Sequence, residues 1–334
     1  MGVWGNTQPA IRNGKKINRS DLADAGLSSL PYVGNVFYVD GVNGSDSNSG
    51  KHQSTALGSL YKAHSLVTDN NFDVIIVASE STGSGSATDE SAAVSGGAWT
   101  FSKNLVTVIG AAAPSLVSNR SRILWDTAAQ STSAALLTIS GSGNRFMNLQ
   151  LGTFVDNNIL VTLTGDRNYF GGVHFAGIGD ATAGDDTAAI TLDINDGDEN
   201  LFEDCVIGLD TVARSTTNTE LRLQGQTQRN IFRDCFFPTF ADNAGHTFVN
   251  ASGSGDIDRW HWFQRCIFHN AVNSTATTMT AAMDLHVSVG GTIILDGCAV
   301  LGVTDWADEY TNLYGCNMPD ITAANGGFME KLAT

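Results

Sequence analysis

The second half of the chain repeats one pattern of apolar and polar positions about every thirty residues. Most copies read Asn, one variable residue, Phe, two more residues and then a small apolar residue, as in Asn200-Leu-Phe-Glu-Asp-Cys205. That last position is filled by Leu149, Val173, Cys205, Cys235, Cys266 and Cys298, and a shortened copy ends at Cys316. The cysteine spacings are 30, 31, 32 and 18 residues. We therefore expect all five cysteines in one column of a solenoid core.

The spacing inside the repeat predicts a bend in the chain. In Phe202-Glu-Asp-Cys205 two apolar positions are three residues apart, but only alternate residues of a straight strand face the same side. Both side chains point inward only if the chain turns a corner between them. The residue before the column position is Asn148, Gly172, Asp204, Asp234, Arg265 or Gly297. Five of these six are of types that tolerate a tight corner.

A second run of alternating apolar residues precedes each copy, as in Leu136–Ile139 and Ile190–Ile194. A turn of Gly, Asp and Asn links the two runs. Because asparagine tolerates left-handed backbone, we expect it at a left-handed corner in four of these turns. These residues are Asn144, Asn168, Asn200 and Asn230. Three short strands and at least two corners per repeat describe one coil of a parallel β-helix, whereas the leucine-rich repeat signature is missing.

The first half of the chain predicts the start of the same solenoid. Residues 36–40 predict a strand, 41–50 a loop, and 57–67 an amphipathic helix. Buried strands follow at 72–77 and 105–109. A helix at this place would cap the open end of the stack, which solenoids require for solubility. We expect an irregular N-terminal arm at 1–35, the β-helix at 36–318 and a C-terminal tail at 319–334.

These motifs resemble a known superfamily. The run Tyr38-Val-Asp-Gly-Val-Asn-Gly-Ser-Asp46, the helix after it and the Asn-x-Phe-x-Asp-Cys segments are similar to pectate-lyase-like right-handed parallel β-helices. The resemblance implies an all-β, single-stranded right-handed parallel β-helix with three short strands per coil. Among its members, the chain looks most like virion structural proteins of tailed phages. The superfamily also contains polysaccharide lyases, glycoside hydrolases and tailspikes, so the fold does not select a function.

Composition narrows the partners. The chain has 334 residues with 36 glycines, 5 prolines and a net charge of −16, which argues against nucleic acid as a partner. No apolar stretch is long enough to span a bilayer, and the first residues show no secretion signal. The exception to the acidic character is a short basic patch near the N-terminus. We interpret it, with a nearby tryptophan, as an assembly contact or alternatively a solvated tail: Trp4, Arg12, Lys15, Lys16 and Arg19.

The odd number of cysteines and the absence of Cys-x-x-Cys pairs do not indicate a disulfide framework. Neighbouring coils lie about 4.8 Å apart, which is too far for the usual Cβ separation in a disulfide. We expect buried free thiols that pack as small apolar residues. A column running along an axis also does not converge on a metal ion, so we assign no metal or other cofactor.

Candidate chemistry is weak. Asp185-Asp186 is the one Asp-Asp pair, but the other motifs of a polygalacturonase-like site are missing. The densest acidic run could hold calcium or form a solvated turn: Asp193, Asp196, Asp198 and Glu199. Trp260 and Trp262 could form a sugar-stacking platform, or one could pack inside while the other lies at an interface. His174, His261 and His269 lie in or beside the repeat motif, where packing or surface roles are expected.

We therefore assign no catalytic residue. The sequence favours a non-catalytic virion protein, a capsid decoration or cement protein of a tailed phage that binds across subunits of the major capsid protein. Free thiols fit assembly in a reducing host cytoplasm. We expect a homo-oligomer, with a trimer as the working guess. The alternative is a phage tailspike or another β-helical protein that binds or depolymerises polysaccharide, as a lyase or glycoside hydrolase.

Overall fold

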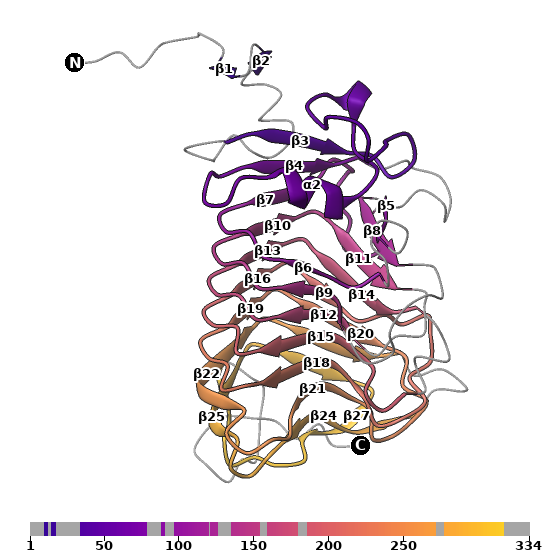
Figure 1. The fold of residues 1–334 in the computed structure, drawn as a ribbon. Helices are drawn as coiled ribbons and strands as arrows, with labels where there is room; N and C mark the ends of the chain where they lie inside the picture. Colours follow the sequence, from indigo (N-terminus) through magenta and orange to yellow (C-terminus); the bar gives the residue numbers. More distant parts are fainter. Residues whose placement is uncertain are drawn as a thin grey trace, which may run out of the picture.

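The chain forms a stack of parallel coils (Figure 1). In this computed structural model the structure describes residues 10–12, 15–17, 34–78, 88–90, 97–119, 121–125, 135–153, 159–179, 186–271 and 277–316. Three parallel sheets run along the stack, and each complete coil contributes one strand to each sheet. The fold is the right-handed parallel β-helix that the sequence predicts, and the elements of the described residues are almost all strands.

Sheet I has ten strands. They are β3 Val36–Val39, β4 Val74–Val77, β7 Thr107–Gly110, β10 Arg145–Met147, β13 Tyr169–Gly171, β16 Leu201–Glu203, β19 Ile231–Arg233, β22 Ile257–Gln264, β25 Gly290–Asp296 and β28 Leu313–Cys316.

Sheets II and III have eight strands each. Sheet II contains β5 Thr88–Asp89, β8 Arg122–Trp125, β11 Gln150–Thr153, β14 His174–Ile178, β17 Val206–Ile207, β20 Phe236–Thr239, β23 Ile267–Asn270 and β26 Ala299–Leu301. Sheet III contains β6 Trp99–Phe101, β9 Ala135–Ile139, β12 Ile159–Leu163, β15 Ile190–Asn195, β18 Thr219–Gln224, β21 Thr247–Ala251, β24 Met279–Leu285 and β27 Val303–Ala307.

A small helical region lies at the N-terminal end of the stack. The 3-10 helix η1 spans Gln53–Thr55, and α2 spans Leu60–Leu66, where it contacts β3, β4 and β6. Asp46, at the end of the motif that carries the resemblance, accepts hydrogen bonds from the backbone N–H groups of Gly58 and Ser59, each at 2.9 Å. The buried Glu90 carboxylate accepts two more, from the N–H groups of Leu60 and Tyr61. These acids satisfy the free donors at the positive end of the helix.

The corner between sheets I and II is a single left-handed residue, as the Phe-to-Cys spacing predicts. All six predicted corner residues have positive φ, between 52° at Arg265 and 63° at Gly297. Arg265, the one residue whose type did not favour a corner, adopts the same backbone as Asp204 and Asp234. The geometry of the coil therefore overrides the local preference of the side chain.

The expected role of the asparagines is wrong. Positive φ falls on the residue before each of them, at Gly143, Arg167, Glu199 and Arg229. The asparagines themselves are buried and form what we call the asparagine row: Asn144, Asn168, Asn200 and Asn230. Each Oδ1 accepts the backbone N–H of the residue one coil earlier, at 2.8 Å in all four cases. An amide in the core thus satisfies a donor that the turn leaves unpaired, which outweighs its preference for left-handed backbone.

Aromatic rings fill the interior beside sheet I. Five phenylalanines stack coil upon coil: Phe146, Phe170, Phe202, Phe232 and Phe263. Their ring centroids are 4.6–5.2 Å apart and the planes differ by 5–9°. Each stacked pair adds roughly 0.5–1.5 kcal/mol to the free energy gained by burying the rings. The recurrence of Phe at one position of the repeat is therefore a packing requirement.

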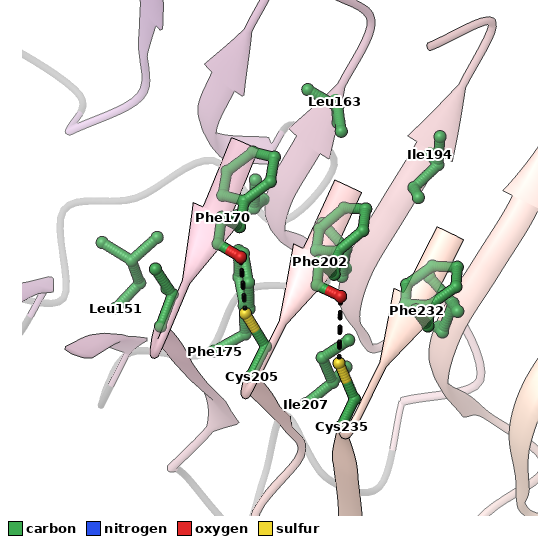
Figure 2. Close-up of a cluster of buried hydrophobic side chains, with 14 of the residues drawn as sticks. Leu151, Leu163, Phe170, Phe175, Ile194, Phe202, Cys205, Ile207, Phe232 and Cys235 are labelled. Atoms are coloured by element: carbon green, nitrogen blue, oxygen red, sulfur yellow. Dashed lines mark hydrogen bonds between the residues drawn. The ribbon is translucent and has the colours of Figure 1, made fainter. Parts of the chain in front are cut away.

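Four cysteines lie in the predicted column as buried free thiols: Cys205, Cys235, Cys266 and Cys298. Each thiol donates to the carbonyl oxygen of the phenylalanine one coil earlier, as Figure 2 shows for Cys205 with Phe170 and for Cys235 with Phe202. Burial raises the pKa of Cys235, and the hydrogen bond with Cys266, followed by burial, raises the pKa of Cys298. These thiols are packing residues that also bond neighbouring coils.

The fifth cysteine departs from the prediction. Cys316 pairs in register with Asp296, two residues before the column position, and it is exposed. The last coil is shorter than the others, so its cysteine does not reach the column position. The placement of Cys316 in the core column is therefore wrong.

Thiol accessibility tests this arrangement. We expect an aromatic disulfide reagent to modify one thiol per native chain quickly, at Cys316, and all five after unfolding. In Cys316→Ser the fast phase should vanish, and the other four should react only as fast as the chain unfolds. A second fast thiol in the native chain would show that the column is not sealed.

The asparagine row gives a stability prediction. Asn200→Ala removes the acceptor of the Asn168 N–H and leaves that donor buried, which should lower the free energy of unfolding by about 1–3 kcal/mol in urea titrations. Asn312→Ala, at a partly exposed turn before β28, is the control and should stay within about 0.5 kcal/mol of wild type. Equal losses for both variants would contradict a special role for the buried amides.

Candidate binding surface

The outer face of sheet I carries a continuous apolar stripe. It runs in register over six strands and consists of Tyr169, Leu201, Ile231, Trp262, Ile294 and Tyr314. These residues directly precede the inward phenylalanine position in each coil, so alternation along the strand turns them outward. Most are partly exposed, and Tyr314 is 40% exposed. In the sequence the stripe corresponds to the apolar residue between Asn and Phe of the repeat. The inward positions alone do not predict it.

Beside the stripe lies a charged row two residues further along each strand. It consists of Glu203, Arg233, Gln264 and Asp296. Arg233 donates to Glu203 at 3.1 Å and to Gln264 at 2.9 Å, and Gln264 donates to Asp296 at 3.5 Å. At the other end, the Tyr169 hydroxyl donates to Glu203 at 3.1 Å. Burial, and then this hydrogen bond, raise the pKa of Tyr169 to about 12, so the phenol stays a donor.

The left-handed corner next to this row is also charged. Arg265 binds Asp234 through two hydrogen bonds, at 2.7 and 2.6 Å. These bonds lower the pKa of Asp234, whereas burial and the neighbouring Asp234 raise the pKa of Asp204. Arginine at this corner therefore compensates a like-charge contact between aspartates of adjacent coils.

Both tryptophans of β22 lie on this outer face. Trp260 and Trp262 are partly exposed, and His261 between them is fully buried. Burial lowers the pKa of His261 to about 3, which keeps the imidazole neutral. The alternative in which one tryptophan packs inside is wrong, because residues 260 and 262 share a face by alternation. The pair remains available to stack on a flat partner.

The acidic run 193–199 does not converge on one point. Asp193 is buried and binds Arg222, at 2.8 and 3.0 Å. Asp198 accepts from Gln228 of the next coil. Glu199 bonds Arg167 at 2.7 Å and Arg229 at 3.1 Å. These three carboxylates are thus engaged in separate rows along the solenoid, and closeness in sequence did not predict closeness of the carboxylates. Among the described residues, no three His, Cys, Asp or Glu side chains group as a metal site.

The remaining sequence candidates are structural or fall outside the description. Asp186 accepts a turn hydrogen bond from the N–H of Ala188, and Asp185 lies outside the described residues. His174 is buried, and burial lowers its pKa to about 4. His269 is partly exposed on sheet II, where its ring stacks on Phe236 at 6.2 Å between centroids.

The sequence did not predict a buried polar cluster next to β18 of sheet III. Glu220 contacts Arg214 at 3.3 Å and His246 at 3.4 Å, and Thr239 donates to it at 3.0 Å. Burial opposes ionisation of Glu220, but Arg214 and His246 outweigh it and lower its pKa to about 2. All four side chains are at most 2% exposed, so a substrate does not reach them. The cluster holds the chain between β17 and β21 in place.

A pair of aspartates on the outer face of sheet III was also missed. Asp284 in β24 lies next to Asp308, just after β27, and the Asn250 amide donates to Asp284 at 2.7 Å. Burial, and then Asp308, raise the pKa of Asp284 to about 6. Asp284 and Asp308 are neighbours because β24 and β27 pair in register. The sequence did not reveal this, because the segment around Asp308 lacks the repeat motif.

The predicted arm is placed only in part. Arg12 ends β1, Ala10–Arg12, and Lys15 and Lys16 begin β2, Lys15–Ile17; the two strands pair antiparallel. Trp4 and Arg19 lie outside the described residues. Within the described part, no helix is long and apolar enough to cross a membrane.

Comparison with known proteins supports the fold. No protein-family model matches the sequence, and a search of curated proteins finds no match. Among solved structures, pectate lyase Pel9A aligns with a TM-score of 0.55 at 14% identity, over 88% of this chain and 72% of that one.

Two further structures are comparable. A pectin methylesterase in complex with a hexasaccharide aligns with a TM-score of 0.54 at 12% identity, over 87% and 92% of the two chains. A rhamnogalacturonan lyase aligns with a TM-score of 0.52 at 12% identity, over 85% and 74%. The chain therefore has the fold of pectate-lyase-like β-helices, a class that includes enzymes acting on polysaccharides. At these identities the likeness extends to the fold alone.

The described outer face of sheet I combines paired charges with apolar surface. Here Glu203 and Asp234 are each held by an arginine. The stripe beside them offers aromatic and aliphatic surface.

The aspartate pair gives a pH prediction. The folded chain holds the Asp284 proton up to about pH 6, whereas an ordinary aspartate loses it near 3.8. The unfolded state therefore releases this proton first as the pH rises. The free energy of unfolding falls as the pH rises from about 4 to about 6, and it stays lower at higher pH.

Asp284→Asn should remove that loss. We expect its Tm to exceed that of wild type by roughly 1–3 °C at pH 7, and the difference to vanish at pH 4 or below. Asp258→Asn, an exposed aspartate paired with Arg259, should show no such pH-dependent gain. Equal melting of Asp284→Asn and wild type at pH 7 would contradict the raised pKa of Asp284.

Proposed function

We propose that the chain is a non-catalytic virion structural protein, a decoration or cement protein of a tailed phage that stabilises the head by binding across subunits of the major capsid protein. The observation that carries the proposal is the outer face of sheet I, where an apolar stripe runs beside a charged row whose members bond one another. Such a face can be covered by another protein at low desolvation cost, because its charges are already paired.

The basic arm fits the same proposal. The chain has a net charge of −16, so a basic segment at one end can bind an acidic surface that the body of the solenoid would repel. Arg12, Lys15 and Lys16 lie within five residues of each other on the β1–β2 pair. The arm would steer association, and the stripe would supply the apolar contact.

A second candidate function has specific support. The pectin- and rhamnogalacturonan-acting enzymes share this fold, and two partly exposed tryptophans lie on the face of sheet I. Aromatic rings can stack on sugar rings, so a polysaccharide-binding spike or a depolymerising enzyme is the alternative.

One experiment separates the two. Purified chain is mixed with emptied phage heads that lack it, and binding is measured by co-sedimentation while head melting is followed by calorimetry. We expect saturable binding and a higher head Tm. Ile294→Glu/Tyr314→Glu places two charges on the stripe and should weaken binding at least tenfold, as should deletion of residues 1–30. Thr280→Glu, exposed on β24 of sheet III, is the control and should bind like wild type.

The contrary result is as clear. Failure to bind heads, together with release of reducing sugar or unsaturated oligosaccharide from host surface polysaccharide, would establish the alternative. Unchanged binding after the deletion would exclude the arm as a contact and leave the stripe in place.

A further inference from the structure

The last described strands of the stack have a neighbour on one side only. β27 and β28 are the final strands of sheets III and I, so they pair with β24 and β25 and with no described strand beyond them. We call residues 303–316, which contain both strands, the terminal segment. A strand inside the stack is held from two sides. The segment at the end of a solenoid is therefore the part that separates most readily.

Two carboxylates meet where the terminal segment leaves sheet III. Asp284 lies in β24, and Asp308 directly follows β27. The N–H of Asp308 donates to the carbonyl oxygen of Met283 at 3.2 Å, and its carboxylate accepts the N–H of Leu285 at 2.8 Å. Asp308 is thus bound to the backbone on both sides of Asp284, and the two side chains share a hydrogen bond.

Both carboxylates are held in place while the terminal segment is seated. Asp284 accepts the Asn250 amide of β21 at 2.7 Å, and Asp308 is fixed by the N–H of Leu285. The hydrogen bond between the acids needs a proton on one of them. When both are ionised, two like charges face each other across that contact and repel.

The charged and titratable groups on the neighbouring elements do not neutralise the pair. They are Arg222 of β18, His286 after β24, Asp305 of β27 and Glu309 in the turn that follows it. Arg222 is held by Asp193, and the Nδ1 of His286 accepts the N–H of Ser288 at 3.0 Å. Glu309 accepts hydrogen bonds within its own turn. Among the described residues, no arginine or lysine offsets the second negative charge beside Asp284.

We infer that the terminal segment is a pH-sensitive closure of the stack: it stays seated while Asp284 and Asp308 share a proton, and it opens as a unit when that proton is lost. In the open state the carboxylates separate into water and ionise independently. The pKa of Asp284, raised to about 6 by burial and then by Asp308, sets the range. An ordinary aspartate loses its proton near 3.8, so opening becomes easier as the pH rises from about 4 to about 6 and stays easier above that.

Opening would uncover strand edges. Release of β27 and β28 leaves the backbone of β24 and β25 without partners on that side, and it takes Trp306 and Leu313 out of the core. An exposed strand edge can pair with a strand of another chain. The closure acts in the free chain, so it does not rest on the proposed function.

Hydrogen–deuterium exchange of the full chain, followed by mass spectrometry at about pH 4.5 and about pH 7.5, tests the closure. After correction for intrinsic exchange rates, the protection factor of peptides within 303–316 should fall about tenfold at the higher pH in wild type. In Asp284→Asn it should change less than about twofold, because the amide does not ionise. Asp258→Asn, an exposed aspartate paired with Arg259, is the control and should lose protection like wild type.

Peptides that cover β16 and β17, in the middle of the stack, distinguish local from global opening. The fall within 303–316 should exceed the fall in these peptides. Equal falls in both regions, constant protection of the terminal segment in wild type, or an undiminished fall in Asp284→Asn overturns the inference. Circular dichroism confirms that the variants are folded. If Asp284→Asn is not, Asp308→Asn, whose amide oxygen can still accept the N–H of Leu285, should abolish the pH dependence instead.

Discussion

The structure depends on the register between adjacent coils, and from β7 to β19 the buried amides of the asparagine row bond one coil to the next in that register. A parallel sheet alone tolerates a shift of one strand against the next, since backbone donors and acceptors recur along it. A buried amide does not tolerate such a shift, because its Oδ1 must accept the N–H of one particular residue in the preceding coil. With that register set, phenylalanine stacks on phenylalanine and each thiol reaches a carbonyl oxygen. The outer rows inherit the same alignment.

Much of the fold could be predicted from sequence because the repeat encodes inward positions directly. The three-residue interval from Phe202 to Cys205 demanded a corner, and Asp204 has the left-handed backbone that the corner needs. The errors have physical causes. Asn200 was expected to use its tolerance of left-handed backbone, but the need of a buried N–H for an acceptor was the stronger constraint. Cys316 kept the local motif but not the spacing, and spacing decides which face a residue occupies.

The candidate surface was harder to predict, because its neighbours are about thirty residues apart. Arg233 meets Glu203 and Gln264 from adjacent coils, and no local pattern announces such a row. Conversely, Asp193 and Asp198 are close in sequence, yet they bond different partners in different rows. In a solenoid the residues that form one face occupy the same position in successive repeats. Aligning the copies and examining the outward columns would have revealed the apolar stripe.

The uniform corner between sheets I and II also limits how such a chain can change. Two residues join β10 to β11, β16 to β17, and β25 to β26, and the same is true of every full coil between them. The connections from sheet II to sheet III vary instead, from one residue between β26 and β27 to eleven between β14 and β15. From β10 on, the edge between sheets I and II thus keeps a constant length, whereas the edge between sheets II and III accommodates extra residues within the same stack of coils. Descendants of this chain can acquire new loops along the second edge, and a designer grafting a foreign epitope would choose the same place.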